Sequence, residues 1–214
     1  MSRTDGLVPG DDGRLRCAWG ASTPDYQRYH DDEWGRPVHG DDAVFERITL
    51  EAFQSGLSWI TILRKREGFR AAFAGFDIAV VASYDDADRA RLLADAAIVR
   101  NRAKIDATIT NARAALDLVQ DQGEGALDRL VWSYAPDAPS RPRTLSDVPA
   151  TTPSSIALSR DLKEKGFAFV GPTTMYAAMQ AMGLVDDHVR GCWVARRSER
   201  PEGTSGASTP PDQG

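Results

Sequence analysis

The cysteines and histidines are the residues whose spacing most directly suggests metal chemistry, because the chain has only 2 Cys and 3 His. His188 and Cys192 have a spacing that would place both side chains on one face of a helix, one turn apart. Cys17 and His30 form a second pair near the N-terminus. The four side chains would make a closed Cys2His2 set, which predicts a structural zinc site. A disulfide between Cys17 and Cys192 is the alternative, but nothing in the sequence indicates an oxidising compartment.

Large aromatic residues and one acidic residue suggest a second kind of site. The aromatic residues around the first pair are Trp19, Tyr26, Tyr29 and Trp34. They could line a pocket, although filling a core is the more common role for any one of them. Glu51 lies beside the apolar side of a helix predicted over 41–53 and capped by Asp41. Its alternative role is that of an ordinary glutamate on a helix surface.

A turn follows this helix directly. Gly56 is expected to end the helix, and Ser58 to cap the next one, which begins at Trp59. Leu57 is therefore predicted to be a large apolar residue at the exposed tip of a helix–turn–helix corner.

The stretch from Leu158 to Gly183 has the pattern of two helices joined by a short apolar hairpin. Gly166 ends the first helix, and Gly171 precedes the second, whose first residues include Thr173. The free N–H groups that begin a helix suit a phosphate, as in helix-hairpin-helix DNA-binding units. An ordinary αα-hairpin with a buried Phe-x-Phe-Val plug is the alternative.

The remaining segments also have helical patterns. Helices are predicted over 85–96, from about Ile105 to Gly123, and over 127–134, with a proline-rich loop from Ala135 to Pro153. Basic residues cluster at 64–66 and 99–104, where a solvated helix face is the more common explanation. No convincing β pattern is present, so the predicted fold class is all-α.

Composition limits the class of protein. The chain has 214 residues, 42% of them hydrophobic, enough for one domain or two small lobes with a core. A net charge of −5 argues against a general nucleic-acid coat but allows a small basic face. Residues 1–15 and 197–214 are predicted to be disordered tails. The absence of a membrane-spanning or signal segment predicts a cytoplasmic protein.

Several motifs, in order, resemble the type I DNA-3-methyladenine glycosylases, a family of helix-hairpin-helix glycosylases. They are Arg16-Cys17-x-Trp19, Tyr29-His30-Asp-x-Glu-Trp34-Gly, Leu50-Glu51-x-x-Gln54-x-Gly56-Leu57-Ser58-Trp59-Ile60, Gly166-Phe-x-Phe169-Val170-Gly171 and Asp187-His188-Val-x-Gly191-Cys192. The resemblance covers roughly residues 16–196, which would form the glycosylase domain with its helix-hairpin-helix unit at about 158–182.

The resemblance implies a role for each matching residue. Structural Zn²⁺ would join the two ends of the domain through Cys17, His30, His188 and Cys192. Glu51 would be the catalytic residue and would recognise the base. The residues implied to bind the base are Glu51, Trp59, Tyr29, Tyr26, Trp19, Trp34 and Gln54. The residues implied to contact DNA are Gly56 and Leu57, as an intercalating wedge, with Gly166, Gly171 and Thr173. The expected partner is double-stranded DNA containing 3-methyladenine, bound by a monomer.

These roles agree with the chemistry of base excision. An enzyme that acts on a base must remove it from the stack, and an apolar wedge can fill the gap. N3-methylation makes the adenine cationic, so aromatic rings and a carboxylate would select it. Asp186 could stabilise an oxocarbenium-like sugar or cap the helix that carries His188 and Cys192; the cap is favoured because a cationic leaving group needs less assistance. The alternative function is a non-catalytic, zinc-stabilised module that binds alkylated or distorted DNA.

Overall fold

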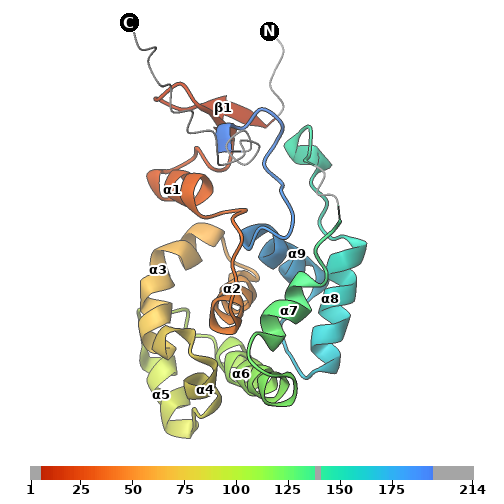
Figure 1. Ribbon diagram of the computed structural model, residues 1–214. Coiled ribbons are helices and arrows are strands. Elements are labelled where there is room, and N and C mark those ends of the chain that lie inside the picture. The colour runs from red at the N-terminus through yellow and green to blue at the C-terminus, as the bar shows by residue number, and fades with distance from the viewer. Residues whose placement is uncertain (1–5, 138–140, 195–214) are drawn as a thin grey trace, which may run out of the picture.

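The protein is mostly helical, as Figure 1 shows for the computed structural model, which describes residues 6–137 and 141–194. The elements in chain order are β1 (Leu7–Pro9), β2 (Leu15–Cys17), α1 (Pro24–Asp32), α2 (Asp41–Gln54), α3 (Trp59–Ala72), η1 (Ala74–Phe76), α4 (Ile78–Ala82), α5 (Asp86–Ala94), α6 (Arg102–Gln122), α7 (Ala126–Trp132), η2 (Leu145–Asp147), α8 (Pro153–Glu164) and α9 (Pro172–Ala181). No helix in these described ranges is long and apolar enough to cross a membrane.

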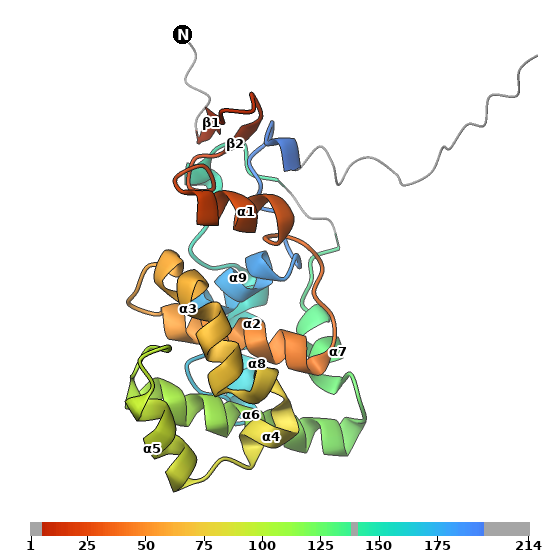
Figure 2. The same ribbon diagram turned by 90° about the vertical axis from the view of Figure 1, so that its left-hand side faces the viewer.

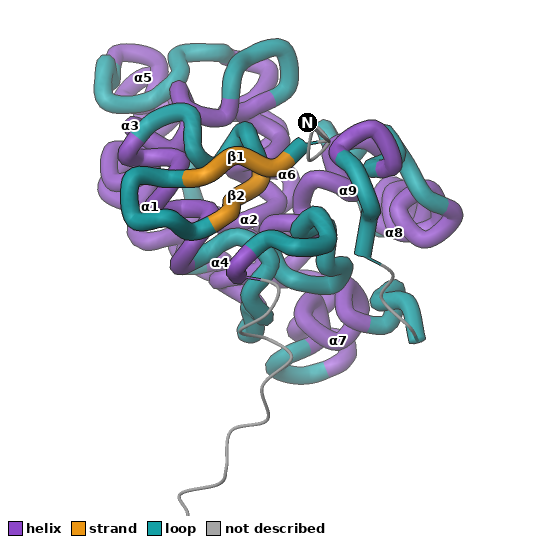
Figure 3. Tube along the Cα trace, turned by 90° about the horizontal axis from the view of Figure 1, so that it is seen from above, coloured by secondary structure: helices purple, strands orange, loops and turns teal. Residues whose placement is uncertain are grey.

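A short antiparallel β-hairpin corrects the all-α prediction and the predicted N-terminal tail. β1 pairs with β2, with Leu7 opposite Cys17, and the pair lies at one end of the molecule above α1 (Figures 1 and 3). The Asp- and Gly-rich sequence that resembled a tail forms the turn, where Gly13 has a positive φ of 72°. The buried Arg16 donates hydrogen bonds to the carboxylates of Asp12, in this turn, and Asp31, on α1. Contacts with distant residues, rather than β propensity, therefore hold the hairpin.

Helix α2 crosses the middle of the helical body, and α6 lies below it in the view of Figure 2 and packs against it. The side chain of Asn101 caps α6 by accepting a hydrogen bond from the Lys104 N–H, and α6 ends at Gly123, whose φ is 82°. The inward side of α6, which includes Ile105, Ile109 and Ala112, is fully buried. One large apolar core joins this side to the buried residues of α2, α3 and α9. Together, α2 and α6 contact α3, α4, α5, α7 and α9, and so position these helices relative to one another.

The start of α2 differs from the prediction that Asp41 caps it. The cap position is Gly40, and the Asp41 carboxylate instead accepts hydrogen bonds from the N–H groups of Gly125 and Asp128 at the start of α7. Asp41 therefore caps a helix far along the chain, because the fold brings the two N-terminal ends together.

The predicted helix–hairpin–helix stretch forms α8, a short loop over 165–171, and α9. Thr152 and Ser155 make a capping box, so α8 begins at Pro153, earlier than the Leu158 expected from the pattern. In the loop, Phe167 and Val170 are buried, whereas Phe169 is 41% exposed with a positive φ of 56°. The loop therefore buries its plug and also presents one aromatic ring to solvent.

Candidate functional site

A cavity of about 480 Å³ opens between α1, α2, α3 and α9. The structure brings all seven predicted base-binding residues to its wall, although they come from three separate segments of the chain. The lining residues are Trp19, Tyr26, Tyr29, Trp34, Glu51, Gln54, Trp59, Leu145, Val148, Ala177, Gln180 and Asp187. A cavity of this size, lined by aromatic rings and a few polar groups, suits a small planar ligand.

The aromatic rings support one another around the cavity. The Trp19 ring makes edge-on contacts with Trp34 at 4.9 Å and with Tyr26 at 5.8 Å between ring centroids. The Tyr29 ring lies 5.3 Å from the Trp59 ring. Trp59 is the first residue of α3, and the Tyr26 hydroxyl accepts a hydrogen bond from the next N–H, that of Ile60, at 3.0 Å. The start of α3 is thereby tied to α1, which holds the two rings in place.

Glu51 is a buried carboxylate in this apolar wall. It projects from α2 and is only 6% exposed, and it has no hydrogen-bond partner within residues 6–137 and 141–194. Burial raises its pKa to about 8, and the positive charge of Arg47, one turn earlier on α2, opposes the rise only in part. Burial, and to a smaller extent the nearby Glu51, also raises the pKa of the Tyr29 hydroxyl. Glu51 is therefore mostly protonated near pH 7 in the empty cavity, and a cationic ligand bound there would favour its ionised form.

The raised pKa of Glu51 predicts a particular pH dependence of stability. The folded state keeps the Glu51 proton up to about pH 8, whereas the unfolded chain releases it near 4.5. The contribution of Glu51 to the free energy of unfolding is therefore fully present below pH 4.5. It is lost as the pH rises through 8, and the loss is on the order of 5 kcal/mol. Glu51→Gln should remove this loss, so its free energy of unfolding should exceed that of wild type increasingly from pH 5 to pH 9. Urea unfolding at several pH values measures the difference, and parallel stability curves would contradict it.

Asp187 is a second carboxylate at the cavity wall that the sequence analysis did not assign to the site. Its Oδ2 accepts hydrogen bonds from the Tyr176 hydroxyl at 2.6 Å and from the Gln180 side-chain amide at 2.7 Å. Both partners lie on α9, one turn apart. The only signal in the sequence was its place beside His188 in a matching motif. α9 and the Asp187 carboxylate that it holds thus contribute polar groups to the cavity wall.

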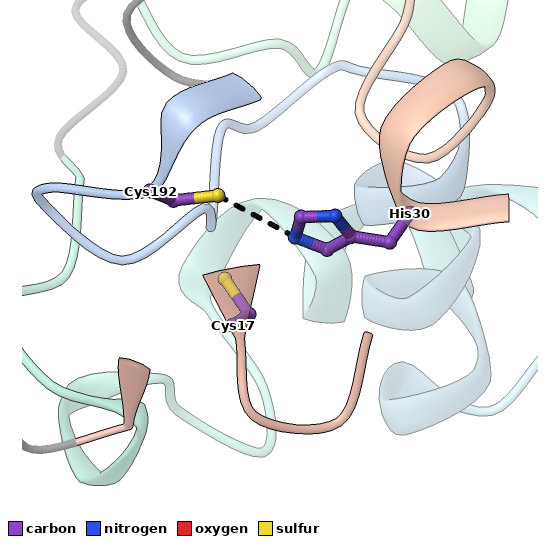
Figure 4. Close-up of side chains that lie close together, drawn as sticks. All are labelled: Cys17, His30 and Cys192. Atoms are coloured by element: carbon purple, nitrogen blue, oxygen red, sulfur yellow. Dashed lines mark hydrogen bonds between the residues drawn. The ribbon is translucent and has the colours of Figure 1, made fainter. Parts of the chain in front are cut away.

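Three of the four predicted metal ligands converge, as Figure 4 shows. The ligand atoms of Cys17, His30 and Cys192 all lie within 4.8 Å of one another, and all three residues are buried. His30 Nε2 is 3.5 Å from Cys192 Sγ. A hydrogen bond from Cys17, together with one from His30, lowers the pKa of the Cys192 thiol. Both cysteines are free, so the disulfide alternative is not formed.

His188 lies beside this group, but its ligand atom is farther than 4.8 Å from at least one of the other three. Its ring centroid is 5.0 Å from that of His30. The predicted helix that would carry His188 and Cys192 is wrong, because residues 188–192 form a turn. Gly191 has a positive φ of 95° there, and the Val189 N–H points at Cys17 Sγ. Asp186 consequently has no helix to cap. Instead it accepts hydrogen bonds from the backbone N–H and the ring Nδ1 of His188.

The chemistry of these four side chains fits a metal ion. His30 Nδ1 is 2.8 Å from Asp31, and His188 Nδ1 is 3.1 Å from Asp186. Carboxylates at both Nδ1 atoms favour the tautomer that leaves Nε2 free to bind a metal. His188 Nε2 is buried without a hydrogen-bond partner in the described part of the chain. Two thiols and two imidazoles oriented in this way are the donor set that zinc prefers.

The predicted DNA-contacting residues lie on the surface, outside the cavity lining. Gly56 has a positive φ of 79°, and Leu57, which follows it, is 42% exposed at the turn between α2 and α3. Gly166 and Thr173 are also exposed, and Gly171 is partly exposed at the cap of α9. Gly56 and Leu57 therefore lie at the end of the helix that carries Glu51, whereas the other three residues lie in the loop between α8 and α9 and at the start of α9.

A mostly helical fold with a carboxylate buried in an aromatic cavity defines a class of protein whose site suits a small planar ligand. Comparison with known proteins specifies the family. Residues 19–196 match the methyladenine glycosylase family. The chain is 50% identical to DNA-3-methyladenine glycosylase 1 of Escherichia coli (strain K12) over 83% of this chain and 95% of that protein. It is 43% identical to the DNA-3-methyladenine glycosylase of Haemophilus influenzae (strain ATCC 51907 / DSM 11121 / KW20 / Rd), again over 83% of this chain and 96% of the relative.

A solved structure of 3-methyladenine DNA glycosylase I from Staphylococcus aureus, described in terms of 3-methyladenine recognition, superimposes with a TM-score of 0.78. It is 35% identical and covers 84% of this chain and 95% of its own. The chain belongs to the methyladenine glycosylase family.

Proposed function

We propose that the protein hydrolyses the N-glycosidic bond of 3-methyladenine in alkylated double-stranded DNA, as a monofunctional enzyme of base-excision repair. The single observation that carries this proposal is Glu51, a buried carboxylate in an aromatic cavity of a chain from this family. A module that only held distorted DNA would not need a buried acid inside a cavity sized for a base.

The reaction begins with removal of the damaged nucleotide from the duplex, because its glycosidic bond is otherwise inaccessible. The flipped base enters the cavity between the rings of Tyr29, Trp59, Trp19 and Trp34. N3-methylation gives the base a positive charge in DNA, which aromatic faces attract. The same charge makes the base a good leaving group. As the bond to the sugar breaks, the electron pair goes to the base, which departs neutral; water then adds to the cationic sugar carbon and releases one proton to solvent.

Glu51 supplies the polar recognition. Its carboxylate accepts a hydrogen bond from the exocyclic amine of the base, and the arriving positive charge favours its ionised form. Neutral adenine offers the same amine without the charge, so the carboxylate distinguishes the damaged base from the normal one. Gln54, three residues later on α2, reaches the same cavity.

Release of free 3-methyladenine from methylated duplex DNA tests the proposed activity. Chromatographic detection of the free base, at a rate that depends on enzyme concentration, is the expected result. Binding to the methylated duplex without any release of base would instead support the alternative, a non-catalytic module for alkylated DNA.

Zn²⁺ is proposed as a structural ion held by Cys17, His30, His188 and Cys192. The support is a full set of four protein donors, which leaves no open position for catalysis. When bound, the ion would tie β2 and α1 to the segment that follows α9, closing the domain at its two ends. The monomeric state stays a prediction from the sequence.

Leu57 is proposed as the wedge that fills the gap left by the flipped base, with the loop over 166–171 and the start of α9 contacting phosphates. The support for the wedge is an apolar side chain that is 42% exposed at the tip of a turn. For the loop, the N–H groups at the start of α9 offer hydrogen bonds and the positive end of the helix dipole.

Leu57→Ala should weaken excision from duplex DNA by about tenfold or more, because the unstacked gap would stay unfilled. The affinity for free 3-methyladenine and the melting temperature should stay near wild type, because Leu57 is not part of the core. Val80→Ala is a matched control, since Val80 is also 42% exposed but lies on α4. A loss of several kcal/mol of stability, as for buried leucines, would show that Leu57 is a core residue.

A further inference from the structure

The buried Lys104 connects α6 to the turn that carries Leu57. Its ammonium group donates hydrogen bonds to the carbonyl oxygens of Phe53 at 2.8 Å and Ser55 at 2.5 Å. These carbonyls belong to the C-terminal end of α2, where a positive charge is favourable. Lys104 is 7% exposed, and burial lowers the pKa of its amine. A buried cation therefore fixes the chain immediately before Gly56 and Leu57.

Asn111 makes a second connection from the same helix to the loop over 166–171. Its side-chain amide donates to the Ala168 carbonyl at 3.0 Å, and its side-chain oxygen accepts from the Ala168 N–H at 2.7 Å. Asn111 is 1% exposed. One side chain thus satisfies both backbone groups at the centre of the loop, beside the strained and exposed Phe169.

Lys104 and Asn111, the two residues that anchor these segments, lie on one side of α6, two turns apart. Seven residues of helix rise about 10.5 Å, and residues i and i+7 share a face. Thr108 lies between them, and its hydroxyl donates a hydrogen bond to the Lys104 carbonyl within the helix. A rigid helix thereby sets the separation between the turn and the loop.

We propose that Lys104 and Asn111 are positioning residues, which hold the Leu57 wedge and the 166–171 loop at the separation that one DNA duplex requires. This inference rests on the proposed function, because it takes both segments to contact DNA. Two DNA-contacting segments held at a fixed separation bind one duplex more tightly than two segments that move independently. The conformational entropy of ordering them has already been lost before the duplex binds. Helix α6 acts as a spacer between Leu57, which contacts DNA at the lesion, and the 166–171 loop, which contacts the phosphate backbone.

The two anchors should have different effects. Lys104→Met keeps the length of the side chain but loses both hydrogen bonds, and should lower excision from a 3-methyladenine duplex by about tenfold. Affinity for an undamaged duplex should change less than about twofold, because the wedge enters only where a base is flipped. Asn111→Leu should instead weaken binding to the undamaged duplex. Both variants should bind free 3-methyladenine as wild type does.

A double-mutant cycle separates positioning from general loss of stability. If Lys104 acts through the wedge, Leu57→Ala should have little further effect in the Lys104→Met protein. Thr108→Val, on the same buried side of α6, is the matched control and should leave excision per folded molecule unchanged. If Lys104→Met does not fold, Lys104→Gln, which can still donate to one carbonyl, should give an intermediate loss of excision.

Several results would overturn the inference. They are full duplex excision by Lys104→Met, independent effects of Lys104→Met and Leu57→Ala, or equal losses of free-base and duplex binding. If Leu57→Ala itself leaves duplex excision unchanged, the proposed wedge fails. If Leu57→Ala lowers excision and Lys104→Met does not, only the positioning inference fails.

Discussion

Glu51→Gln is expected to lower excision of 3-methyladenine by roughly 10- to 150-fold, the range that corresponds to losing a hydrogen bond to a charged group. The substitution preserves the shape of the side chain in the cavity but removes its ability to ionise. It also places an amide NH2 where the exocyclic amine of the base needs an acceptor. Two donors that face each other in a desolvated cavity each lose a hydrogen bond.

Binding of free 3-methyladenine should fall as well, but by less than excision. The positive charge exists only while the base is attached to the sugar, so the electrostatic part of the loss affects the nucleotide and the approach to bond cleavage. The free base loses only the hydrogen bond. Titration of the base, followed by fluorescence or NMR, and single-turnover excision separate the two contributions.

Glu46→Gln is the matched control for this experiment. Glu46 lies on the same helix, but its carboxylate pairs with Arg70 rather than lining the cavity. It should excise the damaged base at the wild-type rate, and both variants should bind undamaged duplex normally because that binding depends on phosphates. Equal free-base affinity for wild type and Glu51→Gln would remove Glu51 from recognition and with it the proposed mechanism.

Cys192→Ala is expected to abolish stoichiometric zinc and to lower stability by several kcal/mol, because apparent zinc affinities of structural sites are about 10–16 kcal/mol in small peptides. Cys192 lies in a small separate cluster with Leu7, Cys17, Val189 and Val194. This cluster joins the two ends of the domain and is too small to hold them by apolar burial alone. Metal analysis and thermal unfolding measure the two effects together.

Two comparisons isolate the contribution of the metal. Val189→Ala removes buried apolar volume from the same cluster and should lower stability while retaining zinc. A chelator should lower the melting temperature of wild type and leave Cys192→Ala unchanged. The folded fraction of Cys192→Ala should still excise 3-methyladenine. Absence of zinc from the wild-type protein, or wild-type stability of the variant, would contradict a structural zinc site.

Local signals in the sequence were sufficient for most of the helices. Asp85 caps α5 with a complete capping box, and Gly123 ends α6 as expected. The start of α6 differs from the prediction, because Asn101 caps the helix and it begins at Arg102 rather than at about Ile105. These signals act within one or two turns, so they can be read without knowledge of the fold. The motifs around Glu51 and Trp59 likewise predicted residues that the structure brings to one cavity.

Elements held by distant partners could not be predicted in this way. The β1–β2 hairpin depends on Arg16 binding Asp31, and the turn at 188–192 is shaped around Cys17 rather than by helix propensity. Asp41 caps α7 instead of its own helix. In each case a tertiary contact outweighs a local preference of a kcal/mol or less.

The sequence by itself therefore determined which residues could do chemistry, because acid, aromatic and metal-ligand side chains are visible as residue types. Only the tertiary structure decided their environments. Burial, and not spacing, raises the pKa of Glu51 to about 8. Asp187 reaches the cavity only because α9 holds it there through Tyr176 and Gln180. The bonds of Lys104 to Ser55 and of Asn111 to Ala168 join residues that are 49 and 57 positions apart, since hydrogen bonds depend on distance in space and not on distance along the chain.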